Sequence, residues 1–124
     1  MFVAEYTTIN TLFFQPCLWV HMSNDEALSW FTEKCGVPVK PRKMFGGVGV
    51  FSDDVMFALI HGGVVYMKST SEMAGKYMDD GYRFEPPFRK GIKMPYWYVP
   101  EMLEDDKLQE WTVESLEHAR ASKR

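Results

Sequence analysis

The stretch that decides the fold is "RKMFGGVGVFSDDVMFALIHGGVVYMK", residues 42–68. It contains three short apolar runs, at residues 48–51, 55–60 and 64–68, separated by Ser-Asp-Asp and His-Gly-Gly turn signals. Connections this short require antiparallel neighbours, because parallel strands need a crossover of a dozen or more residues. The stretch therefore predicts a three-stranded meander, whose middle strand is apolar on both faces and so covered on both.

The run Gly46-Gly47-Val48-Gly49 raises the alternative of a phosphate-binding loop. It matches neither GxGxxG nor GK[ST], and it leads into a predicted strand, whereas phosphate loops present their amides from the start of a helix. We therefore expect these glycines to allow a β-bulge or the close passage of another backbone.

Helices are predicted before and after this meander in the sequence. Ser23 and Glu26 form a capping box that opens a helix over residues 24–35, with Gly36 as its stop. Ser69 and Glu72 form a second capping box, for a helix that runs to about residue 80. A last, acidic helix is predicted from residue 105 or 106 to 121.

A second β pair is predicted at residues 82–88 and 92–99, around the turn Arg89-Lys90-Gly91. Pro86, Pro87 and Pro95 restrict it to edge or irregular strands, and the segment at 37–43 is expected to be extended and exposed. These elements predict an α+β fold, in which an antiparallel sheet of about five strands is packed with helices.

The first 21 residues are predicted to lie outside this domain. They lack the positive start of a secretory signal and are broken by Gln15-Pro16, so they read neither as a signal peptide nor as a membrane span. We expect Met22 to be the start, residues 1–21 to be a non-native extension or a poorly ordered arm, and residues 22–124 to be the domain. The alternative is that apolar side chains of this segment, such as Trp19, dock on the domain or on a partner.

Composition restricts the class of function. The chain has 124 residues with a formal net charge of −3, the wrong sign for a protein that binds nucleic acid mainly by neutralising phosphates. Cys17, Cys35 and the three histidines show no metal-ligand spacing, and no nucleophile can be paired with His61. The sequence predicts a cytoplasmic protein that is not an enzyme and has no cofactor or metal site.

Two short basic segments, at residues 40–43 and 89–93, suggest a contact surface instead. The aromatic run Tyr96-Trp97-Tyr98 is open to three interpretations: packing, a protein interface, or a stacking platform for nucleic acid. The predicted interaction surface combines Arg42, Lys43, Phe45, Arg89, Lys90, Lys93 and Trp97. Binding to a protein partner is the leading hypothesis, direct nucleic-acid binding through the basic segments is the alternative, and homodimerisation is left open.

The same residues carry a family resemblance. The segment at 42–68, followed by "MPYWYVPEMLEDDKLQEW" at residues 94–111, resembles the N-terminal domain of the TfoX/Sxy family of competence regulators. The family pattern is matched by Arg42, Met44 to Gly47, Val55 to Leu59, Tyr66, Lys68, Met94, Tyr96, Trp97 and Pro100. The resemblance covers about residues 23 to 120.

The resemblance implies a two-layer α+β fold like that of secretion chaperones, and a bacterial cytoplasmic regulator of transcription. It implies a role in inducing DNA-uptake genes, with the transcription machinery or a cAMP-receptor-type regulator as partner, and it supplies no catalytic residues. Full-length members carry a second, C-terminal domain for which we expect this chain to have no room, so the resemblance does not by itself extend to competence regulation.

Overall fold

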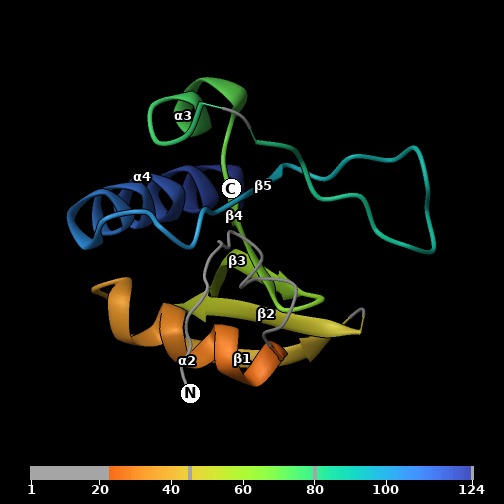
Figure 1. The fold of residues 1–124 in the computed structure, drawn as a ribbon, viewed down its shortest axis with the longest axis horizontal. Coiled ribbons are helices and arrows are strands. Elements are labelled where there is room, and N and C mark those ends of the chain that lie inside the picture. Colours follow the sequence, from red (N-terminus) through yellow and green to blue (C-terminus); the bar gives the residue numbers. More distant parts are fainter. Residues whose placement is uncertain (1–22, 45, 80, 124) are drawn as a thin grey trace, which may run out of the picture.

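The computed structural model describes residues 23–44, 46–79 and 81–123. Within them, helices and strands follow one another as shown in Figure 1. They are α2 (Asn24–Lys34), β1 (Lys40–Met44), β2 (Gly47–Ser52), β3 (Val55–His61), β4 (Val64–Lys68), α3 (Ser71–Gly75), β5 (Tyr96–Tyr98) and α4 (Asp105–Lys123). The five strands form one antiparallel sheet, so the predicted α+β class is confirmed.

The sheet is a simple meander in the order β1-β2-β3-β4-β5, with β3 at its centre. Helices α2 and α4 both pack against β3 and β4, and their buried side chains join one hydrophobic core. We call the sheet face that contributes Val50, Phe57 and Val65 to this core the helical face. The short α3 packs on α4.

The β2–β3 turn and the β3–β4 turn have positive φ at their two central residues. The values are 52° and 65° at Asp53 and Asp54, and 60° and 76° at Gly62 and Gly63. Type I′ hairpin turns require this, and their twist matches the twist of the flanking strands. Glycine reaches positive φ without strain, and aspartate is among the few other residues that tolerate it. The two predicted turns are confirmed.

A β-bulge in β3 lets the sheet serve two cores. Ala58 pairs with Val50 but Met56 pairs with Phe51, so Phe57 is an extra residue without a partner in β2. In consequence the neighbours Phe57 and Ala58 both enter the helical core, and Leu59 turns to the opposite face. We call this opposite face, which holds Met56, Leu59 and Tyr66, the arm face. The prediction that the middle strand is covered on both faces is confirmed.

Gly47 is the position where two backbones pass closely. A β-carbon at this residue would collide with the carbonyl oxygen of Ile60 on the neighbouring strand. The preceding Gly46 has φ of +74° and connects β1 to β2. The expected close passage of a backbone is therefore confirmed at Gly47, whereas the bulge lies at Phe57.

Two side chains of helix α4, Trp111 and Ser115, fix it to the sheet and to the residue that follows β4 by hydrogen bonds. The Trp111 indole N–H donates to Ser69 Oγ at 2.6 Å. The hydroxyl of Ser115 lies 2.6 Å from the Lys68 carbonyl oxygen and 3.1 Å from that of Phe57, the bulge residue. The single hydroxyl proton of Ser115 is thus shared between the two carbonyls, and it offers the Phe57 carbonyl a donor at the point where the bulge breaks the ladder.

The second predicted helix is wrong in its cap and its length. Thr70 is the N-cap, and its side chain accepts from the Met73 amide at 3.1 Å, whereas Ser69 is buried and bonded to Trp111. The helix ends at Gly75, because glycine is a poor helix former and the next amides bond three residues back, which tightens the last turn. The first and last helices agree closely with their predicted ranges.

The strands also differ from the prediction in part. The expected exposed segment forms the edge strand β1, with side chains exposed along most of its length. In the predicted second pair only Tyr96–Tyr98 is a strand, and Arg83 makes an isolated bridge to Trp97. Prolines at 86, 87 and 95 lack the amides that would extend the ladder.

The predictions for residues 1–21 lie outside the described residues. Among the helices that the structure does describe, none combines the length and apolar character needed to cross a bilayer.

We predict that Gly47→Ala lowers the free energy of unfolding by roughly 3 kcal/mol, because the new methyl group meets backbone that cannot move without breaking the β2–β3 ladder. Gly75→Ala is the matched control. Apart from its chain neighbours and the backbone of its own helix, Gly75 has no heavy atom within 4 Å of the added carbon, so stability should rise by up to about 1 kcal/mol. Urea denaturation of both variants gives the comparison, and equal midpoints would contradict the close-passage argument.

Candidate interaction surface

Residues 82–95, which we call the hairpin arm, leave the sheet beside β5 and return into it (Figure 1). The Phe84 amide donates to the Tyr96 carbonyl at 2.7 Å, and the Tyr98 amide donates to the Tyr82 carbonyl at 3.1 Å. The Met94 amide closes the base of the arm on the Phe84 carbonyl at 2.9 Å. The base of the arm thus continues the sheet, and its tip projects beyond it.

Two polar side chains hold the sides of the arm together. The Arg83 guanidinium lies over the Trp97 ring, 4.8 Å from its centroid, and donates to the carbonyls of Met94 at 3.2 Å and Lys93 at 3.4 Å. The carboxylate of Glu85 accepts from the Gly91 amide at 2.6 Å. These contacts cross-link the two sides and organise the arm without a partner.

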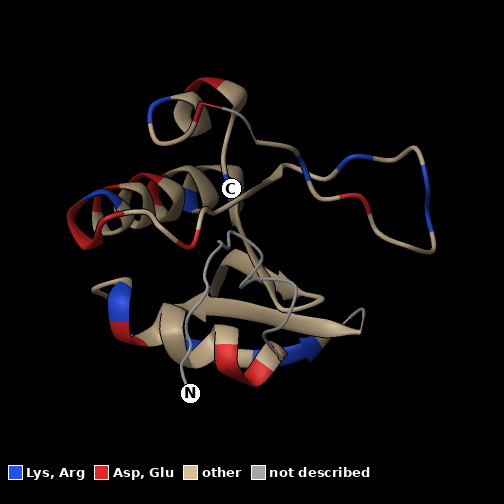
Figure 2. Cartoon of the chain, in the orientation of Figure 1, with Lys and Arg blue, Asp and Glu red and all other residues tan. Residues whose placement is uncertain are grey.

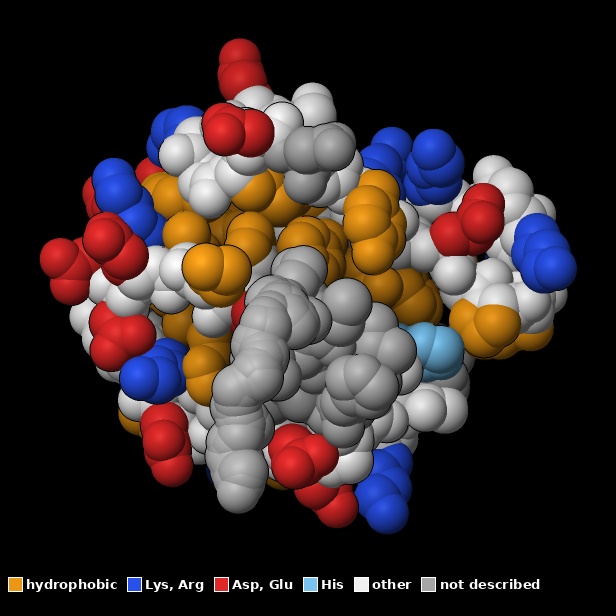
Figure 3. Space-filling view, viewed as in Figure 1, with side chains coloured by type: hydrophobic (Ala, Val, Ile, Leu, Met, Phe, Trp, Pro, Cys, Tyr) orange, Lys and Arg blue, Asp and Glu red, His pale blue; other side chains and the backbone are white. Residues whose placement is uncertain are grey.

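Between the arm and the sheet lies an apolar groove of about 240 Å³. Met56 and Leu59 of β3 form its floor on the arm face, and the arm contributes Phe84, Phe88, Ile92 and Met94. Leu59 and Phe84 are buried, while Phe88 is 61% and Ile92 47% exposed. In Figure 3 apolar side chains gather under the arm on the right of the molecule. The groove therefore has a packed floor and exposed apolar lips.

The arm that forms one side of this groove is positively charged. Arg89 is one of its lining residues, and Lys90 and Lys93 are exposed on the same arm (Figure 2). The arm holds four cationic side chains against the single carboxylate of Glu85, a formal charge of +3 within a chain of −3. The predicted segment at 89–93 is thus a local basic surface on an otherwise acidic protein.

The predicted pair Arg42 and Lys43 is divided by the alternation of strand β1. Arg42 pairs with Gly49 and lies over the Phe51 ring, 5.7 Å from its centroid, on the arm face. Phe51 in turn pairs with Met56, the groove floor, so a row of side chains leads across the sheet from Arg42 to the groove. Lys43 faces the opposite way, towards α2. The structure associates Arg42, but not Lys43, with the arm.

The remaining two predicted residues have different positions. Phe45 lies outside the described residues. Trp97 is half-buried, packs against the helical core and is covered by Arg83. Next to it, Tyr82 and Tyr98 stack with ring centroids 5.5 Å apart and nearly parallel planes, and Tyr82 is exposed. The exposed aromatic group of this edge is therefore Tyr82 rather than Trp97.

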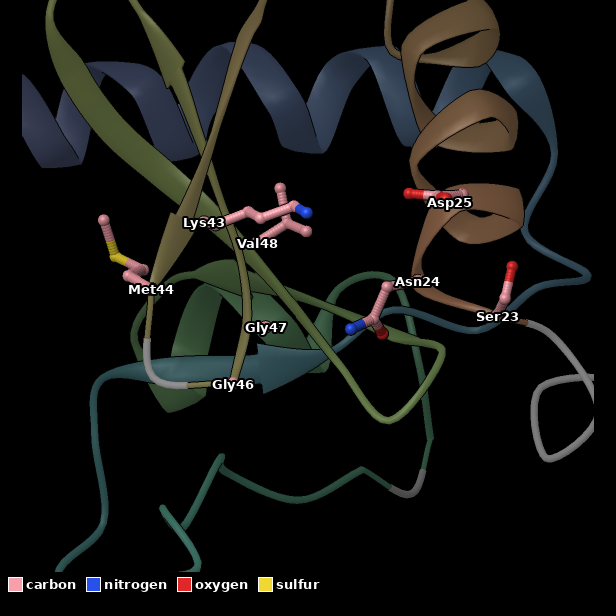
Figure 4. Close-up of a pocket in the computed structure, with 8 residues that line it drawn as sticks. All are labelled: Ser23, Asn24, Asp25, Lys43, Met44, Gly46, Gly47 and Val48. Carbon is pink, nitrogen blue, oxygen red and sulfur yellow. The ribbon is translucent and has the colours of Figure 1, made fainter.

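A second cleft, of about 360 Å³, adjoins the glycine run (Figure 4). Lys43 and Asp25 point towards one another across it from β1 and α2. The start of α2 is already capped, since Ser23 Oγ accepts from the Glu26 amide and the Glu26 carboxylate accepts from the Ser23 amide. The Asp25 and Glu26 carboxylates disfavour an anion here, so this geometry does not resemble a phosphate cradle.

Burial shifts the pKa of tyrosine side chains on the arm face upward. Burial raises the pKa of Tyr66 to about 12, with the neighbouring Tyr82 and Tyr98 adding to the shift. Burial also raises the pKa of Tyr96 and of the Cys35 thiol. His61 packs against Phe84 with ring centroids 5.4 Å apart. Among the described residues, no group of three or more His, Cys, Asp or Glu side chains is placed to hold a metal ion.

Sequence reasoning missed the apolar part of this surface. Phe88 and Ile92 flank the basic turn Arg89-Lys90-Gly91 in the sequence, which is a signal that the turn carries apolar side chains outward. Met56 gives no such signal, because it lies in a continuous apolar run whose facing depends on the bulge at Phe57.

Comparison with known proteins identifies one family. The family described as TfoX N-terminal domain matches residues 32–119 of this chain. A curated relative, the DNA transformation protein TfoX1 of Aliivibrio fischeri, is 33% identical over 88 residues. The aligned region covers 68% of this chain and 42% of that relative, so the chain spans less than half the length of the protein it matches.

We predict that Arg83→Leu loosens the hairpin arm. Loss of the contact over Trp97 and of the bonds to the Lys93 and Met94 carbonyls should speed amide hydrogen exchange in residues 84–94 about tenfold, with little change in the sheet. Arg120→Leu, which removes an exposed ion pair with Asp53, is the control and should leave the arm unchanged. Exchange measured by mass spectrometry tests this, and arm protection that is equal in both variants would refute the role of Arg83.

Proposed function

The chain belongs to the TfoX N-terminal domain family, and from this premise we propose that it is a small regulatory module that acts by binding a protein partner, without catalysis. The name of its relative associates that protein with DNA transformation, and we propose that this chain serves a related process. Its partner would belong to the transcription machinery or be a cAMP-receptor-type regulator, as the family resemblance implies.

One observation carries this proposal: the hairpin arm presents exposed apolar and basic side chains together. Phe88 and Ile92 are exposed beside Arg89, and Lys90 and Lys93 are exposed on the same arm. Protein interfaces combine an apolar centre with a charged rim, and arginine and aromatic residues dominate their binding energy. The arm therefore has the composition of a binding surface.

The packing of Cys35 and His61 supports a non-catalytic role. Cys35 is buried in the helical core, where the raised pKa of its thiol disfavours the reactive thiolate. His61 packs its ring against Phe84 beside the groove. Both side chains are used in packing, and they contribute to different cores.

We predict that reversing the arm charges abolishes partner capture. Tagged protein is used to recover partners from a lysate of the native organism. The triple variant Arg89→Glu, Lys90→Glu, Lys93→Glu should recover at least tenfold less of any stoichiometric partner. The acidic groups of the partner, which the wild-type arm attracts, are repelled by the three glutamates. Lys43→Glu is the matched control, since Lys43 faces away from the arm, and it should capture normally. Arg42→Glu should give an intermediate loss, because Arg42 lies on the arm face.

Recovery of no stoichiometric partner by the wild-type chain would contradict the proposed function. Recovery that the triple variant leaves unchanged would remove the arm as the contact surface.

A second candidate function, direct binding of single-stranded nucleic acid, rests on the aromatic edge of the arm. The exposed Tyr82 stacks on Tyr98, and Arg83 lies over Trp97, next to the basic segment at 89–93. Aromatic faces beside cations are the elements of a stacking platform for unpaired bases. The net charge of −3 opposes this function, and the segment at 40–43 joins the platform only through Arg42.

This second function predicts a steep dependence on salt. A fluorescein-labelled single strand should bind at about 50 mM salt, and replacing Arg89, Lys90 and Lys93 with alanine should lower the slope of log affinity against log salt by about 2. Fluorescence anisotropy provides the measurement. Absence of binding at low salt would remove this candidate and leave the protein-binding proposal unaffected.

A further inference from the structure

We infer that the groove under the hairpin arm is a docking site for a short, acidic, amphipathic segment of a partner protein. In this arrangement bulky apolar side chains of the segment enter the groove, and neighbouring carboxylates meet Arg89, Lys90 and Lys93. The inference rests on the proposed protein-binding function and identifies the chemistry of the partner.

The shape of the groove suits side chains better than a cofactor. Its volume of about 240 Å³ is below the range of about 300–1,000 Å³ that is usual for pockets of small molecules. Its floor is already formed in the free chain, because Leu59 is 1% and Phe84 4% exposed. A partner segment therefore finds a preformed apolar slot on the scale of a few side chains.

The lips of the groove indicate an occupant larger than its cavity. Phe88 and Ile92 expose about half or more of their surface at the outer rim. A small molecule held between the arm and β3 would leave this apolar area in water. A polypeptide segment that crosses the groove covers both lips and excludes water from the contact, which is the arrangement found around binding hot spots.

Charge complementarity with the arm indicates that the segment carries negative charge. The arm carries a formal charge of +3, so the remainder of the chain carries −6. Arg89 lines the groove itself, and the Glu85 carboxylate is occupied by the Gly91 amide. Acidic residues on the segment would be attracted to the arm, whereas the net negative charge of the remainder of the chain disfavours their binding over most of the other surface.

The rigidity of the arm favours binding of an extended or disordered segment. Arg83 and Glu85 cross-link the two sides of the arm, and the Arg89 and Ile92 amides bond to the carbonyls of Pro86 and Arg89 at 3.1 Å. An arm that is ordered before binding loses little conformational entropy, so the cost of ordering falls on the segment alone.

The experiment selects ligands without knowledge of the partner. A phage-displayed library of random dodecapeptides is selected on the full chain, and enriched peptides are synthesised with a fluorophore for anisotropy. We expect bulky apolar residues next to Asp or Glu, and affinity that weakens at high salt. Ile92→Asp and Arg89→Glu should each weaken binding at least tenfold.

Val113→Asp is the matched control. Val113 is 49% exposed, nearly the same as Ile92, but it lies on α4 rather than on the arm. Both aspartate variants replace an exposed aliphatic side chain and should fold normally, so a difference between them reports the groove. Binding of the enriched peptides to Val113→Asp should equal binding to the wild-type chain.

Several outcomes would overturn the inference. They are failure to enrich peptides, enriched peptides without acidic residues, and equal binding to Ile92→Asp and the wild-type chain. Self-association of the wild-type chain that Ile92→Asp abolishes would assign the groove to a second copy, and oligonucleotide binding lost in the same variant would assign it to nucleic acid.

The outcome for the groove is separable from that for the proposed function. If the wild-type chain captures a partner from lysate, and capture is lost in the triple charge variant but not in Ile92→Asp, the protein-binding function holds and the groove is not its docking site. If capture is lost in both and kept in Val113→Asp, the groove is the site.

Discussion

One extra residue in the central strand determines how the rest of this protein is arranged. Without a bulge, strict alternation would place Leu59 with the helices and Ile60 on the opposite face. The unpaired Phe57 reverses this assignment, so that Ile60 enters the helical core and Leu59 enters the second one. The hydroxyl of Ser115 on α4 then lies against the Phe57 carbonyl. The bulge and the last helix are thus mutually dependent features.

The second core, on the arm face of the sheet, explains the position of the hairpin arm. Leu59, Met56 and Tyr66 would expose a broad apolar surface on the arm face if nothing covered them. Phe84 and Tyr96 cover the side near β4 and β5, and the arm then turns outward at its prolines. Leu59 is buried, but Met56 beside it is covered only in part, and the groove is the space that remains above it. The binding surface therefore follows from incomplete coverage of a sheet face.

Local signals made much of the fold predictable, and tertiary effects account for the errors. Capping boxes and paired turn residues specify the helix at 24–34 and the two hairpins, because their physics lies within a few residues. The bulge could not be predicted from the sequence. Val-Met-Phe-Ala-Leu-Ile is apolar at every position, so a change in which face each residue occupies leaves no polar–apolar pattern to detect. Ser69 looked like a cap by spacing, but a distant tryptophan, Trp111, bonds its hydroxyl. The prediction of the candidate surface failed for a similar reason. Arg42 and Lys43 are neighbours in the sequence, but strand alternation places their side chains on opposite faces of the sheet.

The net charge of the chain does not reveal the positive charge of the hairpin arm, which is the feature most relevant to binding. A total of −3 argues against strong phosphate binding by the whole chain, yet it is the sum of +3 on the arm and −6 elsewhere. Screening at physiological salt limits charge effects to about 8 Å, so a partner that touches the arm experiences mainly the arm's own charge. Most of the acidic residues of α4 are exposed and belong to the solvated side of that helix rather than to the arm. Recognition by this protein is therefore governed by the local composition of a short loop, in which two exposed apolar side chains and three cations are held together on a rigid base.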